Sequence, residues 1–184
     1  IFAVFDGHCG RGVADFCERH LCAELWFDEL FRARALGRAL RAVFHRMDEL
    51  LLDMGMIAEE AAQRPPSPPP PPGPRAAGAI APTAGGHHSG CTAVVALVDA
   101  ARRKLAVANA GDSRAVLCRR GRALQVSHDH KPSSPEETRR IVAGGGFVSA
   151  LGRVNGNLNL SRSIGDLKYK RNPDAAREAQ ARAP

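Results

Sequence analysis

Short apolar runs alternate with polar turns along much of the chain, and two stretches follow the helical period instead. Residues 1–5 are continuously apolar and predict a buried strand that ends at Asp6-Gly7-His8. From Arg11 onward, apolar residues recur every three or four positions, which predicts a helix. A second apolar stripe from Leu36 to Met54, interrupted by Arg, Asp and Glu, predicts another helix. Two amphipathic helices of this kind must cover an apolar sheet.

Four more strands are predicted after Ser89. They are rich in Val, Leu and Ala, are separated by tight turns, and lie at residues 92–99, 104–109, 114–118 and 123–126. Their order indicates an antiparallel meander. The run Ser134-Pro135-Glu136-Glu137 is typical of a helix start with a capping box, and Gly144-Gly145-Gly146 ends that helix. Residues 147–150 are predicted as a further strand, and Asn155-Gly156 as a hairpin turn.

Residues 58–88 break this pattern and predict an insertion. The segment from Pro65 to Pro74 is almost pure proline, which cannot form a helix or a strand ladder. A surface insertion in a loop is favoured over a docking site for a signalling domain. Deletion of residues 60–88 is therefore expected to change the free energy of unfolding by no more than about 0.5 kcal/mol. No fold is assigned to residues 173–184, which lack an apolar stripe.

Length and composition favour one globular domain, with 184 residues of which 44% are hydrophobic. No stretch approaches the ~20 apolar residues of a membrane span, so no membrane association is expected. The net charge is +7, but no nucleic-acid-binding motif accompanies it, which indicates a solvated basic surface and no nucleic-acid partner. The first residue, Ile1, is no initiator, so the sequence is expected to begin in mid-domain.

The five cysteines form no C-x-x-C pair and are odd in number. This argues against a structural zinc site and against a disulfide framework. It favours a reducing intracellular compartment, cytoplasmic and/or nuclear.

The turn Asp6-Gly7-His8 combines a carboxylate, an unhindered carbonyl and an imidazole at a strand end. Hard cations such as Mg²⁺ and Mn²⁺ prefer carboxylate and carbonyl oxygens, and a neighbouring His can donate a proton to a departing alkoxide. Asp-Gly turns are common at strand ends, however, so this turn alone is weak evidence for a metal site. Read alone, Gly111-Asp112 is likewise a hairpin turn rather than a ligand site.

Seven short motifs follow one another along residues 1–172, and their order changes this interpretation. They lie at residues 2–8, 89–93, 108–114, 129–132, 145–148, 153–156 and 160–166, with Glu137, Arg140-Ile141 and Tyr169-Lys170 beside them. In this order they resemble the type 2C family of metal-dependent protein serine/threonine phosphatases.

The resemblance implies an α+β fold: a four-layer α/β/β/α sandwich of two antiparallel sheets flanked by helices, incomplete at both ends. It implies that Asp6 bridges two Mg²⁺ or Mn²⁺ ions, that Gly7 gives a carbonyl ligand and that His8 is the general acid. Asp112 is implied as an auxiliary ligand near a further, weaker metal position. The implied reaction is hydrolysis of phosphoserine and phosphothreonine in phosphoprotein substrates by a metal-activated water, without a phosphoenzyme, in a monomer.

The chain departs from the family pattern in ways that leave an alternative open. The family's acidic pair and phosphate-binding Arg precede the strand at residue 1, and two later metal carboxylates should follow Tyr169. Cys9 stands where a small residue is usual, and Cys91 where Ser is common. The alternative is a catalytically incompetent fragment or pseudophosphatase that binds proteins. We expect the isolated 184-residue chain to show little or no Mn²⁺-dependent hydrolysis, and a version extended through those segments to be active.

Overall fold

The main sheet joins strands from three distant parts of the chain. In the computed structural model, which describes residues 1–63 and 89–170, the strand order is β1 (Phe2–His8), β2 (Gly90–Asp99) and β3 (Lys104–Ala110). A two-residue strand, β6 (Ile164–Gly165), pairs with the start of β2. All of these pairs are antiparallel, but of the meander predicted after Ser89 only the pair of β2 and β3 lies in this sheet. This sheet is the frame that positions the candidate site.

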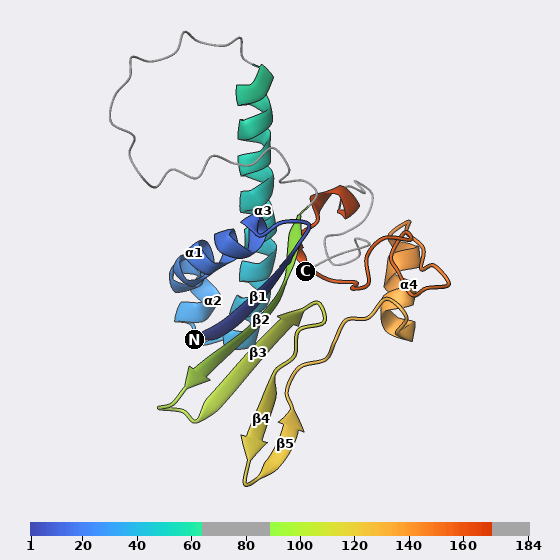
Figure 1. Cartoon of the computed structure of the whole chain (residues 1–184). Coiled ribbons are helices and arrows are strands. Elements are labelled where there is room, and N and C mark those ends of the chain that lie inside the picture. Colours follow the sequence, from blue (N-terminus) through green and yellow to red (C-terminus); the bar gives the residue numbers. More distant parts are fainter. Residues whose placement is uncertain (64–88, 171–184) are drawn as a thin grey trace, which may run out of the picture.

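Three helices cover one face of this sheet (Figure 1): α1 (Gly12–Phe27), α2 (Glu29–Arg32) and α3 (Leu36–Gln63). Because strand side chains alternate between faces, every second residue of β2 faces the helices. The buried core that results consists mainly of Val13, Cys17, Leu21, Leu25, Ala39, Leu40, Val43, Phe44, Met47, Cys91, Ala93, Val95 and Leu97. The apolar stripes that predict α1 and α3 are thus confirmed as core positions as far as Leu51, whereas Met54 is exposed. The short α2, capped by Asp28, was not predicted.

Two cysteines meet inside this core. The Sγ atoms of Cys17 and Cys91 lie 3.8 Å apart, and both side chains are fully buried. The hydrogen bond between the two thiols, together with burial, raises the pKa of Cys91. Cys91 therefore serves as a small apolar core residue and not as a nucleophile.

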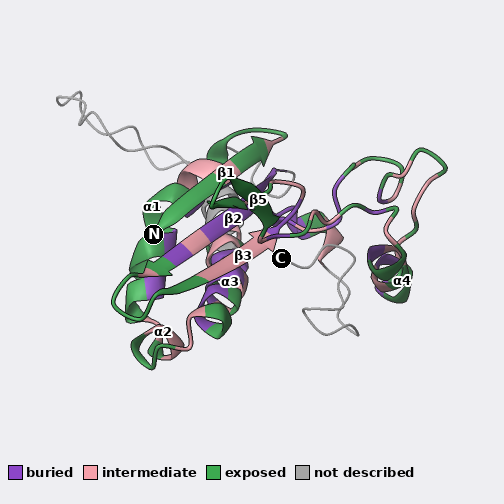
Figure 2. Cartoon of the chain, turned by 90° about the horizontal axis from the view of Figure 1, so that it is seen from below, coloured by how far each residue is buried: buried purple, intermediate pink, exposed green. Residues whose placement is uncertain are grey.

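The opposite face of the sheet is largely open. Strand β1 was predicted to be buried, and this is wrong: it is an edge strand, with Phe2 70% and Val4 59% exposed. Figure 2 shows the exposed β1 beside the mostly buried β2. A second antiparallel sheet, formed by β4 (Val116–Arg119) and β5 (Arg122–Gln125), extends beyond β3. The expected α+β class with two antiparallel sheets is confirmed.

Helix α4 (Pro135–Ala143) starts and ends where the sequence predicts, but the predicted capping box does not form. Neither bond of the box is present: Ser134 makes no side-chain capping bond, and the Glu137 carboxylate binds Ser161 and Arg162 while the Ser134 N–H donates to the Lys131 carbonyl. Residues 147–150 form only an isolated bridge between Val148 and Val154 rather than a strand. Asn155 and Gly156 have φ angles of 48° and 77°, as a hairpin turn requires. The described chain ends after the short helix η1 (Leu167–Tyr169).

Helix α3 continues beyond residue 58, where an insertion was predicted to begin, and reaches Gln63. Residues 58–62 are Ala and Glu, which are strong helix formers, so the helix continues towards the first proline. The rest of the predicted insertion, residues 64–88, and the tail from residue 171 lie outside the described residues. No helix in residues 1–63 or 89–170 is long and apolar enough to cross a membrane.

Candidate active site

The turn that ends β1 and the turn that ends β3 lie at the same end of the sheet. Asp6 is paired with Thr92 across β1 and β2, and the register between β2 and β3 continues to the pair Ala93–Ala110. Gly111 therefore follows directly beside Thr92, where a Cβ on Gly111 would come within 2.7 Å of Thr92 Cγ2. Asp6 and the Gly111-Asp112 turn are brought to one edge of the main sheet.

The side chain of Asp6 points to the open side of the sheet. Asp6 is exposed, whereas the preceding Phe5 packs against the core. Within the part of the chain that the structure describes, no hydrogen bond or ion pair engages the Asp6 carboxylate. Both of its oxygens are consequently accessible from solvent.

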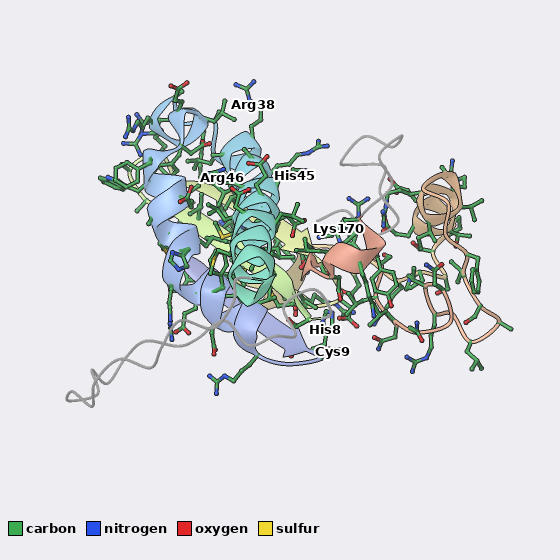
Figure 3. All side chains as sticks on the ribbon, turned by 90° about the horizontal axis from the view of Figure 1, so that it is seen from above. His8, Cys9, Arg38, His45, Arg46 and Lys170 are labelled. Carbon is green, nitrogen blue, oxygen red and sulfur yellow. The ribbon has the colours of Figure 1, made fainter. Side chains whose placement is uncertain are left out.

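His8 lies two residues further along the same strand and binds a buried carboxylate. Its Nε2 is 2.7 Å from Oδ2 of Asp166, whose side chain is 1% exposed, while the His8 side chain is 21% exposed. The Oγ of Ser163 donates a second hydrogen bond to the same oxygen, at 2.7 Å. Figure 3 shows His8 next to Cys9 at the turn that follows β1.

The backbone around Gly90 explains how His8 and Asp166 meet. Gly90 pairs with His8 on one side and with Gly165 on the other, so that β1 and β6 flank it. A Cβ at Gly90 would lie 2.5 Å from Asp166 Oδ2 and 2.8 Å from His8 Nε2. The two side chains thus meet across a position where only glycine leaves room. Asp166 itself has a φ of 52°, a left-handed conformation that Asp tolerates better than most residues.

This close approach gives a testable prediction. Gly90→Ala is expected to lower the free energy of unfolding by about 1–3 kcal/mol, because the new methyl group overpacks the buried pair. The urea unfolding midpoint measures this loss. Gly12→Ala is the matched control, since a Cβ there would meet nothing within 4 Å. Equal midpoints for the two variants would contradict the packing described at Gly90.

A second buried carboxylate anchors the segment that carries Asp166. Asp48 of α3 accepts a hydrogen bond from the Gly165 N–H at 2.8 Å and from Lys170 Nζ at 2.5 Å. Lys170 also donates to the carbonyl of Ser163 at 2.7 Å. Burial raises the pKa of Asp48, and the nearby Lys170 charge opposes that shift. Asp48 therefore fixes the position of β6 relative to the helical layer.

Asp112 is bound within the turn after β3. Its Oδ2 accepts from Lys131 Nζ, with the Asp112 side chain 23% exposed. The turn is held by a backbone hydrogen bond from the His130 N–H to the Gly111 carbonyl and by the side chain of Asn109, which donates to the same carbonyl. Burial lowers the pKa of His130, whose Nδ1 accepts from the Gly111 N–H. His130 is accordingly a structural acceptor in this turn.

Glu137 organises the chain before β6. Its carboxylate accepts from Arg162 at 2.7 Å, from Arg140 at 2.7 Å and from Ser161 at 2.6 Å, and it is 3% exposed. Burial alone would raise the pKa of Glu137, but the hydrogen bonds from Arg162, Arg140 and Ser161 outweigh it and lower the pKa to about 2. The cluster joins α4 to the segment that continues into β6.

The predicted metal ligands form only part of a cation shell. Among the residues that the structure describes, no group of three or more His, Cys, Asp or Glu side chains is arranged to hold a metal ion. Asp6 fits a hard cation, because its carboxylate has no competing partner among the described residues, and the predicted carbonyl ligand Gly7 follows it in β1. Asp112 does not fit until Lys131 moves away. Of the predicted metal ligands, Asp6 is the one best placed to bind a cation.

No role was predicted from the sequence for Asp166, Ser163 or Asp48. The sequence does contain a signal for Asp166, because a position between the apolar residues Ile164 and Leu167 favours burial. A buried carboxylate needs partners. Which partner it finds could not be derived, because His8 is 158 residues away in sequence.

Comparisons with known proteins agree with the order of the motifs. The family model "Protein phosphatase 2C" matches residues 1–183. The chain belongs to the protein phosphatase 2C family. It is 46% identical over 171 residues to "Protein phosphatase 2C 1" of Paramecium tetraurelia, covering 93% of this chain and 51% of that protein.

Solved structures share the fold with this member of the protein phosphatase 2C family. A C. elegans sex determining protein superimposes with a TM-score of 0.68 and 27% identity, covering 92% of this chain and 36% of that one. A phosphatase from a pathogenic strain of Toxoplasma gondii superimposes with a TM-score of 0.63 and 23% identity, over 97% of this chain and 60% of that one. The chain spans about half the length of the curated relatives that it matches.

Proposed function

We propose that the whole protein hydrolyses phosphoserine and phosphothreonine esters in proteins, with Mg²⁺ or Mn²⁺ as cofactor. The observation that carries this proposal is the end of β1. There an accessible Asp6 carboxylate and a carboxylate-bound His8 lie on one open face of the sheet. Membership of the protein phosphatase 2C family supports the same reaction class.

Asp6 and Gly7 would hold the cations through oxygen atoms. Two divalent cations held there would supply the Lewis acidity that activates a water molecule for in-line attack at phosphorus. Asp112, at the same edge, is proposed as an auxiliary ligand for a third cation, which it can bind only by exchanging its bond with Lys131. These residues set the place of the phosphate relative to His8.

His8 would complete the reaction as general acid. As the bond between phosphorus and the Ser or Thr oxygen breaks, the imidazolium donates its proton to that oxygen. The products are inorganic phosphate and the free hydroxyl, and a proton released by the attacking water restores the imidazolium. The partly exposed ring of His8 is consistent with contact to substrate.

The proposal is tested by phosphate release from phosphoserine and phosphothreonine peptides by the whole protein. Phosphate release is expected with Mn²⁺ or Mg²⁺, and it should stop when a chelator is added. Release that is unaffected by the chelator would rule out the metal-dependent reaction. Saturable phosphopeptide binding without any release would favour the alternative, a catalytically incompetent protein-binding module.

The state of the cysteines is relevant to the cellular compartment of the protein. All five are free thiols, and Cys9, Cys22 and Cys118 are exposed. We propose on this ground a reducing intracellular location, where exposed thiols stay reduced.

A further inference from the structure

We infer that Asp166 is the positioning residue for His8, and that its buried carboxylate fixes the orientation and tautomer of the imidazole. The inference rests on the proposed function, in which His8 donates the proton to the leaving oxygen. It assigns a role in that reaction to a residue that is distant from the Asp6-Gly7-His8 turn in sequence. The role is indirect, because Asp166 acts through His8.

The burial of Asp166 is the first argument. Its residue is 0% exposed, and the fold supplies it with a side-chain partner on each side: His8 from β1 and Ser163 from its own segment. An ionised carboxylate is costly to bury unless its hydrogen bonds are made. The pairing is therefore a specific contact within the fold and not a surface ion pair.

The backbone is arranged around this pair, which is the second argument. Gly90 leaves the space in which the two side chains touch, and the left-handed conformation of Asp166 aims the carboxylate at that space. The Asp166 N–H is bonded to the carbonyl of Ser89 at 2.9 Å, and Gly165 is bonded to Asp48. Unfavourable backbone conformations persist where the surrounding structure holds them, often at functional sites.

The hydrogen bond between His8 and Asp166 also involves a particular nitrogen of the ring, Nε2. With Asp166 ionised, its Oδ2 can only accept, so Nε2 of His8 would carry the proton in this contact. Nδ1 is buried and has no hydrogen-bond partner among the residues that the structure describes. Because Nδ1 is enclosed, the contact of Nε2 with Asp166 is the polar contact that sets how the ring lies. Asp166 would thus hold the partly exposed ring of His8 in one orientation for its contact with substrate.

The experiment compares two substrates of the whole protein in the presence of Mn²⁺. A phosphothreonine peptide has a basic leaving oxygen that needs a proton, whereas the leaving group of p-nitrophenyl phosphate needs none. Asp166→Asn is expected to slow the peptide reaction about 10- to 100-fold and the aryl phosphate reaction by no more than about threefold. The double variant with His8→Ala should be no slower than His8→Ala alone, because the two residues act as a unit.

Asp48→Asn is the matched control, because it tests whether a general loosening of residues 163–170 explains the effect of Asp166→Asn. It removes the charge of the other buried carboxylate that holds residues 163–170, without touching His8. It should affect both substrates equally. Ser163→Ala should show the selectivity of Asp166→Asn in weaker form. If Asp48→Asn shows the same selectivity as Asp166→Asn, the positioning role is overturned in favour of a structural one.

The outcomes separate this inference from the proposed function. If His8→Ala slows both substrates equally, the general-acid role of His8 fails. If His8→Ala is selective for the peptide and Asp166→Asn is not, only the role of Asp166 is overturned. A readout without turnover is the ring ¹⁵N spectrum of His8, which should show the proton on Nε2 in the wild type and a changed tautomer balance in Asp166→Asn. A wild-type ring protonated on Nδ1 alone would also overturn the inference.

Discussion

Glu137→Gln is expected to lower the free energy of unfolding by about 3–5 kcal/mol, the usual loss when one partner of a buried ion pair is removed. The carboxylate of Glu137 accepts from two arginines and a serine while it is nearly fully buried. A neutral amide cannot accept from all three, and it leaves the Arg140 and Arg162 charges in a poorly solvated place. Urea unfolding of the purified protein measures the change.

The same carboxylate predicts how stability depends on pH. The pKa of Glu137 is lowered from 4.5 to about 2 in the folded protein. A carboxyl group with a depressed folded pKa stabilises the fold above its unfolded pKa, and this contribution is lost as pH falls through the folded value. The wild type should therefore lose stability between about pH 4.5 and pH 2, and Glu137→Gln should lack this part of the loss.

Glu136→Gln is the matched control, because Glu136 lies in the same first turn of α4 but is exposed. It should change the free energy of unfolding by no more than about 0.5 kcal/mol. A Glu137 variant as stable as the Glu136 variant would show that the cluster does not stabilise the domain.

Asp6→Asn is expected to abolish phosphopeptide turnover of the whole protein while the fold stays intact. Asp6 is exposed and makes no contact that holds the described chain together, so the isosteric amide should not alter the unfolding midpoint. An amide is a weaker ligand for hard cations than a carboxylate. Metal-ion stabilisation of the transition state amounts to several kcal/mol, so its loss should reduce turnover by about 10³-fold or more.

Asp15→Asn is the control for this variant. Asp15 is another carboxylate near the start of α1, where it pairs with the exposed Arg11. Such surface pairs contribute little, so turnover and stability should both stay close to those of the wild type. Turnover of Asp6→Asn at the level of Asp15→Asn would mean that the reaction is carried out elsewhere.

The sequence predicts the main elements of the fold because their signals are local. The stripe of Val13, Cys17, Leu21 and Leu25 identifies the buried face of α1, and Asn155-Gly156 identifies a turn. The burial of β1 was predicted wrongly, because a run of apolar residues looks the same in an edge strand as in a central one. The half of the capping box that depends on Glu137 was missed for a related reason, because its carboxylate binds tertiary partners such as Arg162 that the local sequence does not reveal.

The site likewise contains residues that are close in sequence and contacts that only the fold creates. Asp6, Gly7 and His8 are adjacent in sequence, so their proximity needs no knowledge of the fold. The contact between His8 and Asp166 depends on the pairing of β1 and β6 with opposite sides of Gly90, a register that no local pattern specifies. The bond between Asp112 and Lys131 likewise depends on how the segment after β5 folds back onto the turn.

The central claim is that Asp6 holds the metal cofactor while His8 acts on the substrate, and Mn²⁺ binding to the whole protein tests it most directly. Electron paramagnetic resonance of free Mn²⁺ measures the bound fraction without any turnover. The wild type and His8→Ala should bind Mn²⁺ with similar affinity, whereas Asp6→Asn should bind at least about tenfold more weakly, since even residues behind metal ligands have effects of that size. Equal Mn²⁺ affinity in Asp6→Asn and the wild type would contradict the assignment of the site.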